Sequence, residues 1–170
     1  MRTRRRRAGA GRSRRVAVRG GFRSLLIGVD GSPGSRRAVS FVGALEPPAG
    51  ARALVVRVVD PVELRSIALL PASARATLRV QAAGLEAERI RAARRNVDAA
   101  VAQLEKAGWR ARGEVRVGVP IVELLRSAKR SGADLLAVGA RGIGRVEKFL
   151  LGSVADACAK RSPISVVIAK

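Results

Sequence analysis

The chain has 170 residues, no histidine and a single cysteine, and its formal net charge at pH 7 is +21. Without an imidazole, Ser-His-Asp, Cys-His and zinc-hydrolase mechanisms are excluded. One cysteine also excludes an intrachain disulfide and a Cys–Cys zinc site. No apolar stretch approaches the roughly 20 residues of a membrane helix, and the basic amino terminus lacks the apolar region of a secretory signal. We therefore expect a cytoplasmic protein with no membrane contact.

The positive charge is concentrated at the amino terminus. Ten of the 34 basic residues lie within residues 1–23, a segment that has no acidic residue. We expect residues 1–22 to form a disordered basic tail and residues 23–170 to form one domain. The tail could contact nucleic acid or anionic lipid through their phosphates. An arginine-biased proteome or a misplaced start codon would explain it equally well.

Apolar runs and helix-forming segments alternate along the rest of the chain. Runs typical of buried strands occupy residues 24–29, 53–59, 110–119, 134–138 and 164–168. Helical patterns occupy residues 33–45, 77–107, 120–131 and 153–160. Residues 61–76 have no clean period, so we expect a loop there with one helical turn between residues 63 and 70. This alternation predicts an α/β fold, a doubly wound five-stranded parallel sheet with helices on both faces.

Capping and core positions follow from the same patterns. Ser32 and Pro33 predict the N-cap and first residue of the first helix. Ser153 and Asp156 have the spacing of a capping box at the start of the last helix. Cys158 is expected to be a small buried hydrophobe. Other expected core residues are Ala38, Val39, Val42, Leu45, Ile90, Ala93, Val97, Val101, Leu104, Ile121, Leu124, Leu125 and Ala128.

A glycine-rich segment joins the fourth predicted strand to the last helix. Gly139, Gly142, Gly152 and Ser153 give the spacing G-x2-G-x9-G-[ST]. Glycine lets the backbone approach a ligand closely, and a helix N-terminus offers unpaired N–H donors to an anion. Arg141, Arg145 and Lys148 add positive charge in the same segment. The segment predicts a phosphate site, although a lone G-x-x-G would indicate only a flexible loop.

This spacing resembles that of the ATP-binding branch of the universal stress protein family. Further similarities are Leu25-Leu-Ile-Gly-Val-Asp30, Arg57-Val-Val-Asp60, Gly118-Val-Pro120 and Asp134-Leu-Leu-Ala-Val-Gly139. The resemblance covers residues 22–170 and implies a Rossmann-like sheet with strand order 3-2-1-4-5. It also implies ATP binding with Mg²⁺ or Mn²⁺, and a homodimer formed through the C-terminal strand.

The resemblance assigns roles to eight residues. It places Asp30 and Val58 beside the adenosine, with Val58 contacting the adenine through its backbone. It places Val138 and Gly139 against the ribose. The implied phosphate contacts are Gly142, Gly152, Ser153 and Val154. Neither the sequence nor the resemblance supplies a catalytic residue or a dedicated metal ligand.

The motif content favours a nucleotide-binding regulator in stress response over an enzyme. The turn after the first strand lacks G-x-G-x-x-G, and no Walker G-x-x-x-x-G-K-[ST] motif occurs. Rapid ATP hydrolysis would need a group that positions the attacking water, and none is evident, although slow hydrolysis stays open. The alternative is a nonspecific nucleic-acid-binding protein that uses the arginine-rich tail on the same scaffold.

Overall fold

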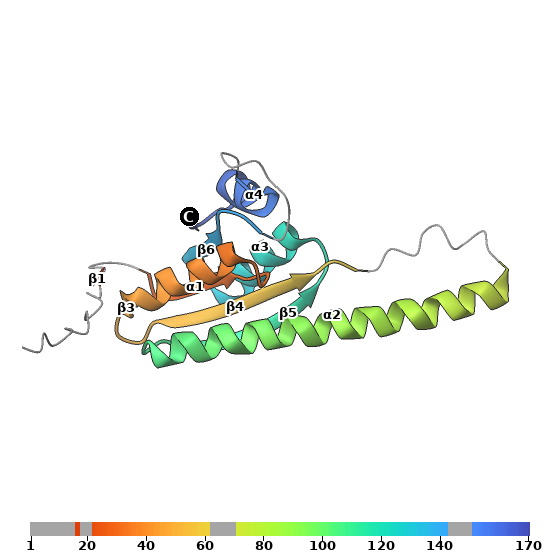
Figure 1. Ribbon diagram of the computed structural model, residues 1–170. Helices are drawn as coiled ribbons and strands as arrows, with labels where there is room; N and C mark the ends of the chain where they lie inside the picture. Colours follow the sequence, from red (N-terminus) through yellow and green to blue (C-terminus); the bar gives the residue numbers. More distant parts are fainter. Residues whose placement is uncertain (1–15, 18–21, 62–70, 143–150) are drawn as a thin grey trace, which may run out of the picture.

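The apolar runs of the sequence form a five-stranded parallel sheet (Figure 1). The computed structural model describes residues 16–17, 22–61, 71–142 and 151–170. The strands are β2 (Ser24–Gly28), β4 (Arg52–Val59), β5 (Arg110–Val117), β6 (Leu135–Gly139) and β7 (Ser165–Ala169). Their order is β5-β4-β2-β6-β7 and every neighbouring pair is parallel, which confirms the predicted order 3-2-1-4-5.

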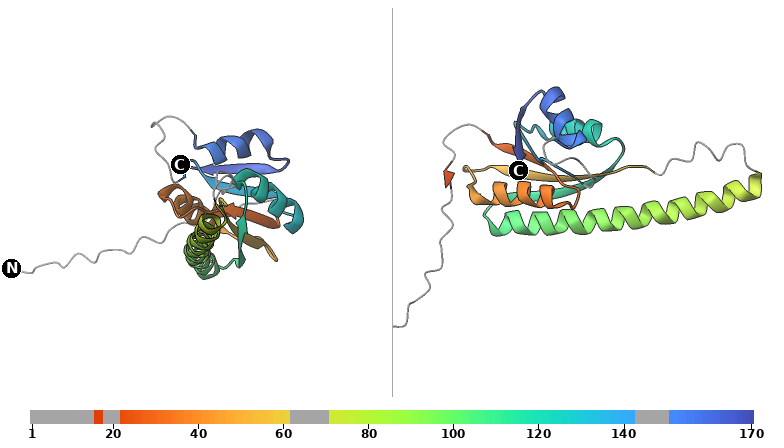
Figure 2. Two further views of the ribbon diagram at one scale, coloured as in Figure 1. Left: turned by 90° about the vertical axis from the view of Figure 1, so that its right-hand side faces the viewer. Right: turned by 45° about the horizontal axis from the view of Figure 1, so that its top comes forward.

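Four helices cover the two faces of this sheet (Figure 2). They are α1 (Pro33–Ala44), α2 (Ala72–Lys106), α3 (Pro120–Ser131) and α4 (Ser153–Arg161). Helices α1 and α2 pack on one face and α3 and α4 on the other, so each face has its own apolar core. Because the sheet is covered on both sides, its central strands are largely apolar; Leu25, Leu26 and Ile27 of β2 are fully buried.

Local sequence signals explain how α1 begins. Ser32 is its N-cap, and the Ser32 hydroxyl oxygen accepts a hydrogen bond from the Ser35 backbone N–H at 3.1 Å. Pro33, which follows, loses nothing at a position where the N–H has no helical acceptor. These observations confirm the predicted cap. They also fix the turn that leads from β2 into the helix, and this turn bears the first candidate site residue.

The long helix α2 begins earlier than the sequence analysis predicted. It starts at Ala72 rather than residue 77, so the expected loop over residues 61–76 is wrong for its last five residues. The alanine-rich start of the helix has high intrinsic helix propensity, and this propensity leaves no apolar period in the sequence. The helical turn expected between residues 63 and 70 lies outside the described residues.

Two smaller boundaries also differ. The alternating valines predicted a strand to Val119, but β5 ends at Val117 because Gly118 has a φ of +148° and breaks the extended conformation. Val119 instead becomes the N-cap of α3. Within the predicted tail, β1 (Val16–Ala17) pairs in parallel with β3 (Leu45–Glu46), directly after α1.

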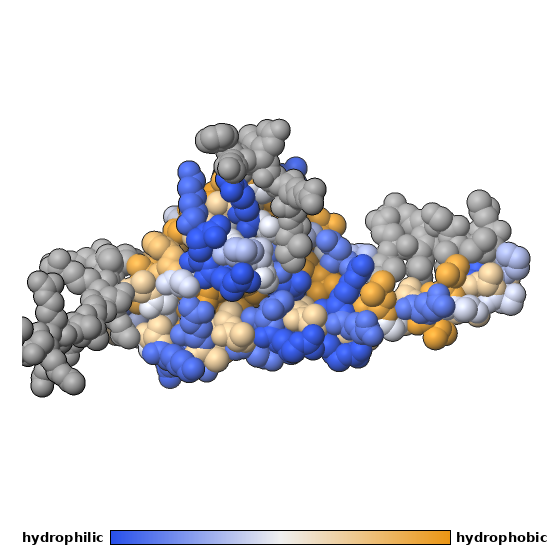
Figure 3. Space-filling view, viewed as in Figure 1, coloured by the Kyte–Doolittle hydropathy of each residue, from blue (hydrophilic) through white to orange (hydrophobic). Residues whose placement is uncertain are grey.

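The first half of α2 projects beyond the sheet (Figure 1). The buried residues of this helix, Ala93, Val97, Ala100 and Leu104, all lie in its second half. On the projecting half, Val80 and Leu85 are exposed, and Figure 3 shows apolar side chains gathered there.

Among the described helices, none combines the length and the apolar character that crossing a membrane requires.

Candidate functional site

A cavity of about 680 Å³ opens at the carboxyl edge of the sheet. Parallel α/β sheets bind ligands at this edge, where the strand order reverses between two neighbouring strands. Here the reversal falls between β2 and β6, which lie side by side. All eight candidate residues line this one cavity: Asp30, Val58, Val138, Gly139, Gly142, Gly152, Ser153 and Val154. Their individual roles remain predictions.

Asp30 follows β2 and is held by the turn that starts α1. Its Oδ1 atom accepts a hydrogen bond from the Ser32 backbone N–H at 2.9 Å. Its Oδ2 atom faces Gly142, and a Cβ atom at Gly142 would collide with it. The carboxylate therefore lies between the first strand and the glycine-rich segment, although the two are far apart in the sequence.

The glycine-rich segment packs closely against the start of α1 at two glycines. A Cβ atom at Gly139 would collide with the backbone of Gly34, and a Cβ atom at Gly34 would collide with the carbonyl of Arg141. The Ser32 hydroxyl donates a hydrogen bond to the same Arg141 carbonyl at 3.2 Å. Gly139 and Gly34 thus have a packing role whether or not a ligand is present. Gly34 was not among the predicted site residues, because its position directly after Ser32-Pro33 is the only signal that the sequence offers for it.

The start of α4 presents hydrogen-bond donors to the cavity. Gly152 is the N-cap, and its N–H is already bonded to the carbonyl of Ala140 at 2.8 Å. The backbone N–H groups of Ser153 and Val154 have no acceptor among the described residues. First-turn N–H groups with the positive end of the helix dipole form a ready site for an anion.

The predicted capping box at Ser153 is wrong. Ser153 is the first helical residue rather than the N-cap, and no side chain caps α4. Asp156 instead pairs with Lys160 at 2.8 Å. Gly152 takes the cap position because the extended conformation before the helix ends one residue earlier than the serine pattern suggested. The exposed Ser153 hydroxyl is consequently not engaged in a cap and is available to a ligand.

A half-buried arginine supports this edge from the α2 side. The Arg57 guanidinium lies under the Asp30–Gly31 turn, where its Nη1 would be 3.2 Å from a Cβ atom at Gly31. Burial lowers the pKa of Arg57, and the negative charge of Asp30 partly offsets this effect. Its Nε and Nη1 atoms are buried and have no hydrogen-bond partner within the part of the chain that the structure describes. Arg57 stays cationic because its ordinary pKa is so high, and it places positive charge behind Asp30.

The cavity has an apolar part and a charged part. Val58, Val138, Val154 and Leu124 provide aliphatic wall, and Leu124 also belongs to the core under α3. The cationic lining residues are Arg57, Arg89 and Arg141. Arg89 reaches the cavity from α2, and neither it nor Ser35 or Pro120 had been singled out as a site residue. An aromatic ring with an attached anion fits such a division. Arg145 and Lys148, expected nearby, lie outside the described residues.

The carboxylates of the cavity do not form a metal cage. Asp30 and Asp60 are its acidic lining residues. Across the described ranges, no group of three or more histidine, cysteine, aspartate or glutamate residues could hold a metal ion.

The fold and the cavity define a doubly wound α/β domain with its ligand site at the carboxyl edge of the sheet. Residues 21–170 match the Universal stress protein family, and the chain belongs to this family. It is 28% identical to a universal stress protein of Thermus aquaticus over 88% of this chain and 99% of that one. It is 31% identical to universal stress protein MJ0577 of Methanocaldococcus jannaschii over 68 residues, which are 40% of this chain and 42% of that protein.

Solved structures share the fold. The MJ0577 structure matches with a TM-score of 0.73 and 21% identity, covering 87% of this chain and 95% of the other. A universal stress protein in complex with cAMP matches with a TM-score of 0.59 and 24% identity, over 88% and 98% of the two chains. A universal stress protein from Archaeoglobus fulgidus in complex with dAMP matches with a TM-score of 0.60 and 19% identity, over 86% and 97%. Two of these similar proteins therefore bind adenine nucleotides.

Proposed function

We propose that this protein binds ATP in the carboxyl-edge cavity and acts as a nucleotide-dependent regulator in stress response, without strong catalysis. The observation that carries this proposal is the convergence of all eight candidate residues on one cavity. Those residues come from the ends of three strands, the glycine-rich segment and the start of α4. The cAMP and dAMP complexes of similar proteins support an adenine nucleotide as the ligand class.

The triphosphate is assigned to the α4 side of the cavity. The N–H groups of Ser153 and Val154 are unengaged donors, and the Ser153 hydroxyl adds a third. Gly142 lets the backbone approach the phosphates, and Arg141 lines the same part of the cavity. Hydrogen bonds from N–H groups to an ionised oxygen are roughly twice as strong as neutral ones, so this end supplies much of the affinity.

The adenosine is assigned to the opposite side, between the ends of β2 and β4. Val58 lies near the end of β4 and supplies both aliphatic contact and backbone hydrogen-bonding groups for the adenine. Asp30, oriented by the Ser32 N–H, is placed to accept hydrogen bonds from the nucleoside. Val138 and Gly139 close the site against the ribose.

A divalent cation would enter with the nucleotide. The cavity lacks a cluster of three metal-ligating side chains in the described ranges. Mg²⁺ commonly keeps several waters and binds through substrate phosphates with one or two carboxylates, an arrangement that Asp60 could complete. Mg²⁺ or Mn²⁺ would neutralise phosphate charge that the protein donors leave uncompensated.

Two further parts of the proposal concern assembly and the tail. The sheet ends at β7, whose outer edge has no strand partner among the described residues, and a symmetry mate would cover that edge in a homodimer. The tail, with ten arginines within residues 1–23, is the candidate element for nonspecific nucleic-acid contact. Such contact would weaken steeply with salt and would depend on the tail, whereas ATP affinity would depend on the cavity.

Calorimetric titration of ATP and of adenosine tests the assignment of the two ends. Ser153→Ala removes a phosphate donor and should weaken ATP binding roughly fivefold to tenfold, with adenosine affinity unchanged. Asp30→Ala should weaken both ligands by similar factors. Because Ser153 is not a cap, the thermal midpoint of Ser153→Ala should stay near that of the wild type. Equal loss of ATP and adenosine affinity in Ser153→Ala would contradict the assignment.

A further inference from the structure

A second cavity lies at the opposite edge of the sheet, where the strands begin. It has a volume of about 670 Å³. Its lining residues are Ser24, Arg52, Ala53, Leu54, Glu105, Arg110, Ala111, Arg112 and Ser131. Among the described residues, none lines both this cavity and the nucleotide cavity. The two cavities are therefore separate, and we call this one the amino-edge groove.

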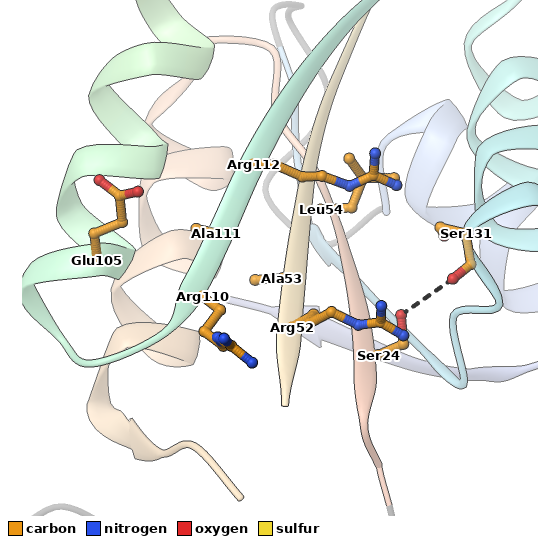
Figure 4. A pocket seen from close by; sticks show the side chains of 9 residues that line it. All are labelled: Ser24, Arg52, Ala53, Leu54, Glu105, Arg110, Ala111, Arg112 and Ser131. Carbon is orange, nitrogen blue, oxygen red and sulfur yellow. Dashed lines mark hydrogen bonds between the residues drawn. The ribbon is translucent and has the colours of Figure 1, made fainter. Parts of the chain in front are cut away.

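Three arginines crowd the amino-edge groove. Arg52 of β4 and Arg110 of β5 are direct partners in the parallel register, and Leu54 and Arg112 are the next such pair on that face. Figure 4 shows the guanidinium groups of Arg52 and Arg112 on the same side of the sheet, with Leu54 beside Arg112 and Ser131 beyond. Like charges placed opposite each other on neighbouring strands repel and destabilise the pairing.

Among the described residues, one carboxylate, that of Glu114, pairs with a groove arginine, Arg112. Glu114 is shared by three arginines: Arg130 at 2.7 Å, Arg116 at 3.7 Å and Arg112 at 3.8 Å. No ion pair of the described residues includes Arg52 or Arg110.

Among the described residues, Asp134 and Glu105 form no ion pair with the groove arginines. Asp134 accepts hydrogen bonds from the backbone N–H groups of Arg23 at 2.8 Å and Ser24 at 3.3 Å. Glu105 belongs to α2, and Figure 4 places it on the far side of β5 from Arg52 and Arg112. Three arginines against one glutamate among the lining residues leave the groove with a net positive charge.

We propose that the amino-edge groove is a binding site for a small phosphate-bearing anion, of the class of inorganic polyphosphates. Guanidinium groups bind phosphate oxygens through paired hydrogen bonds, and three of them around one groove match several linked phosphates better than a single carboxylate. The volume is that of a small-molecule site. None of the described lining residues is aromatic, so they offer no platform on which a nucleobase could stack. This absence favours a free phosphate chain over a nucleic acid.

Inorganic tripolyphosphate is the probe for this site. It is titrated calorimetrically into the full chain, into the double variant Arg52→Gln/Arg112→Gln, and into the control Arg94→Gln/Arg95→Gln. The control removes the same charge from exposed positions of α2. We expect the groove variant to bind at least tenfold more weakly than the control, and the control to bind like the wild type.

Backbone amide chemical shifts locate the binding, which separates this site from the tail and from the nucleotide cavity. Tripolyphosphate should move the amides of Ala53 and Ala111 in the wild type and the control, and leave them unmoved in the groove variant. Equal affinity of the two double variants would overturn the proposal. So would shift changes confined to residues 1–23 or to Ser153 and Val154, or tighter binding of a 12-nucleotide single strand than of tripolyphosphate at this groove.

Discussion

The carboxylate of Asp30 occupies the space into which any side chain at Gly142 would project. This contact joins the turn after β2 to the glycine-rich segment after β6, and Ser32 reinforces it by bonding both Asp30 and the Arg141 carbonyl. The two sides of the proposed nucleotide site are therefore in direct contact. A change at Gly142 should displace Asp30 as well as block the phosphates.

Replacing Arg57 by methionine should raise the stability of the fold and weaken ATP binding. The substitution removes two buried donors that lack a hydrogen-bond partner among the described residues, so the free energy of unfolding should rise by about 1 kcal/mol. ATP affinity should nevertheless fall roughly tenfold, which corresponds to about 1.4 kcal/mol, because Asp30 loses the cation behind it. Urea denaturation and calorimetry measure the two effects. Arg89 also lines the cavity but is exposed, so Arg89→Met is the control and should not raise the free energy of unfolding. A lower free energy of unfolding in Arg57→Met would show that the guanidinium has favourable partners in the native state.

Gly113 should prove necessary for the packing of α2 on β5. A Cβ atom at this position would collide with the side chain of Val97, which is fully buried. Gly113→Ala should therefore lower the free energy of unfolding by roughly 1–3 kcal/mol. In Gly43→Ala the new Cβ would meet Ala107 at an ordinary 3.7 Å, and the helix should gain up to about 1 kcal/mol. Equal stability of the two variants in urea denaturation would count against the described register of α2.

Cys158 should behave as an inert thiol in the folded protein. Burial raises its pKa from the ordinary 9.0 to about 11, so the neutral form dominates in the native state at pH 8. Iodoacetamide should modify the protein only after unfolding. The unfolded chain ionises first as the pH rises, so the associated stability is complete below about pH 9 and is lost between about pH 9 and pH 11. A Cys158→Ala variant should lose this component of the pH dependence; rapid modification of the native protein would refute the assignment.

The exposed outer edge of β7 should be covered in solution. We expect light scattering at micromolar concentration to give twice the 17.9 kDa mass of the chain. A monomer at that concentration would refute the dimer.

The doubly wound parallel class and the first helix cap were predictable from local signals, whereas the strand order was implied by the family resemblance. Five apolar runs separated by helical patterns leave few ways to build a parallel sheet, and Ser32-Pro33 is a strong helix start. The eight candidate residues converge because parallel strands place their carboxyl ends at one edge. Topology alone therefore brings Asp30 and Gly142 close.

Other features depend on contacts that no local pattern contains. Gly34 matters because the Arg141 carbonyl rests against it, and Arg57 because the Asp30 turn covers it. The start of α2 was misplaced because alanine-rich helix needs no apolar stripe where it leaves the sheet. The position of Ser153 differed by a single residue, which was enough to turn a predicted cap into a free hydroxyl.

Calorimetric titration of ATP into Gly142→Val tests the nucleotide site most directly. The control is Gly84→Val, which introduces the same side chain into open space on α2. Thermal melts of both variants accompany the titrations. We predict that Gly142→Val remains folded and loses ATP binding, while Gly84→Val binds ATP like the wild type. A folded Gly142→Val protein that binds ATP with wild-type affinity would contradict the proposed site.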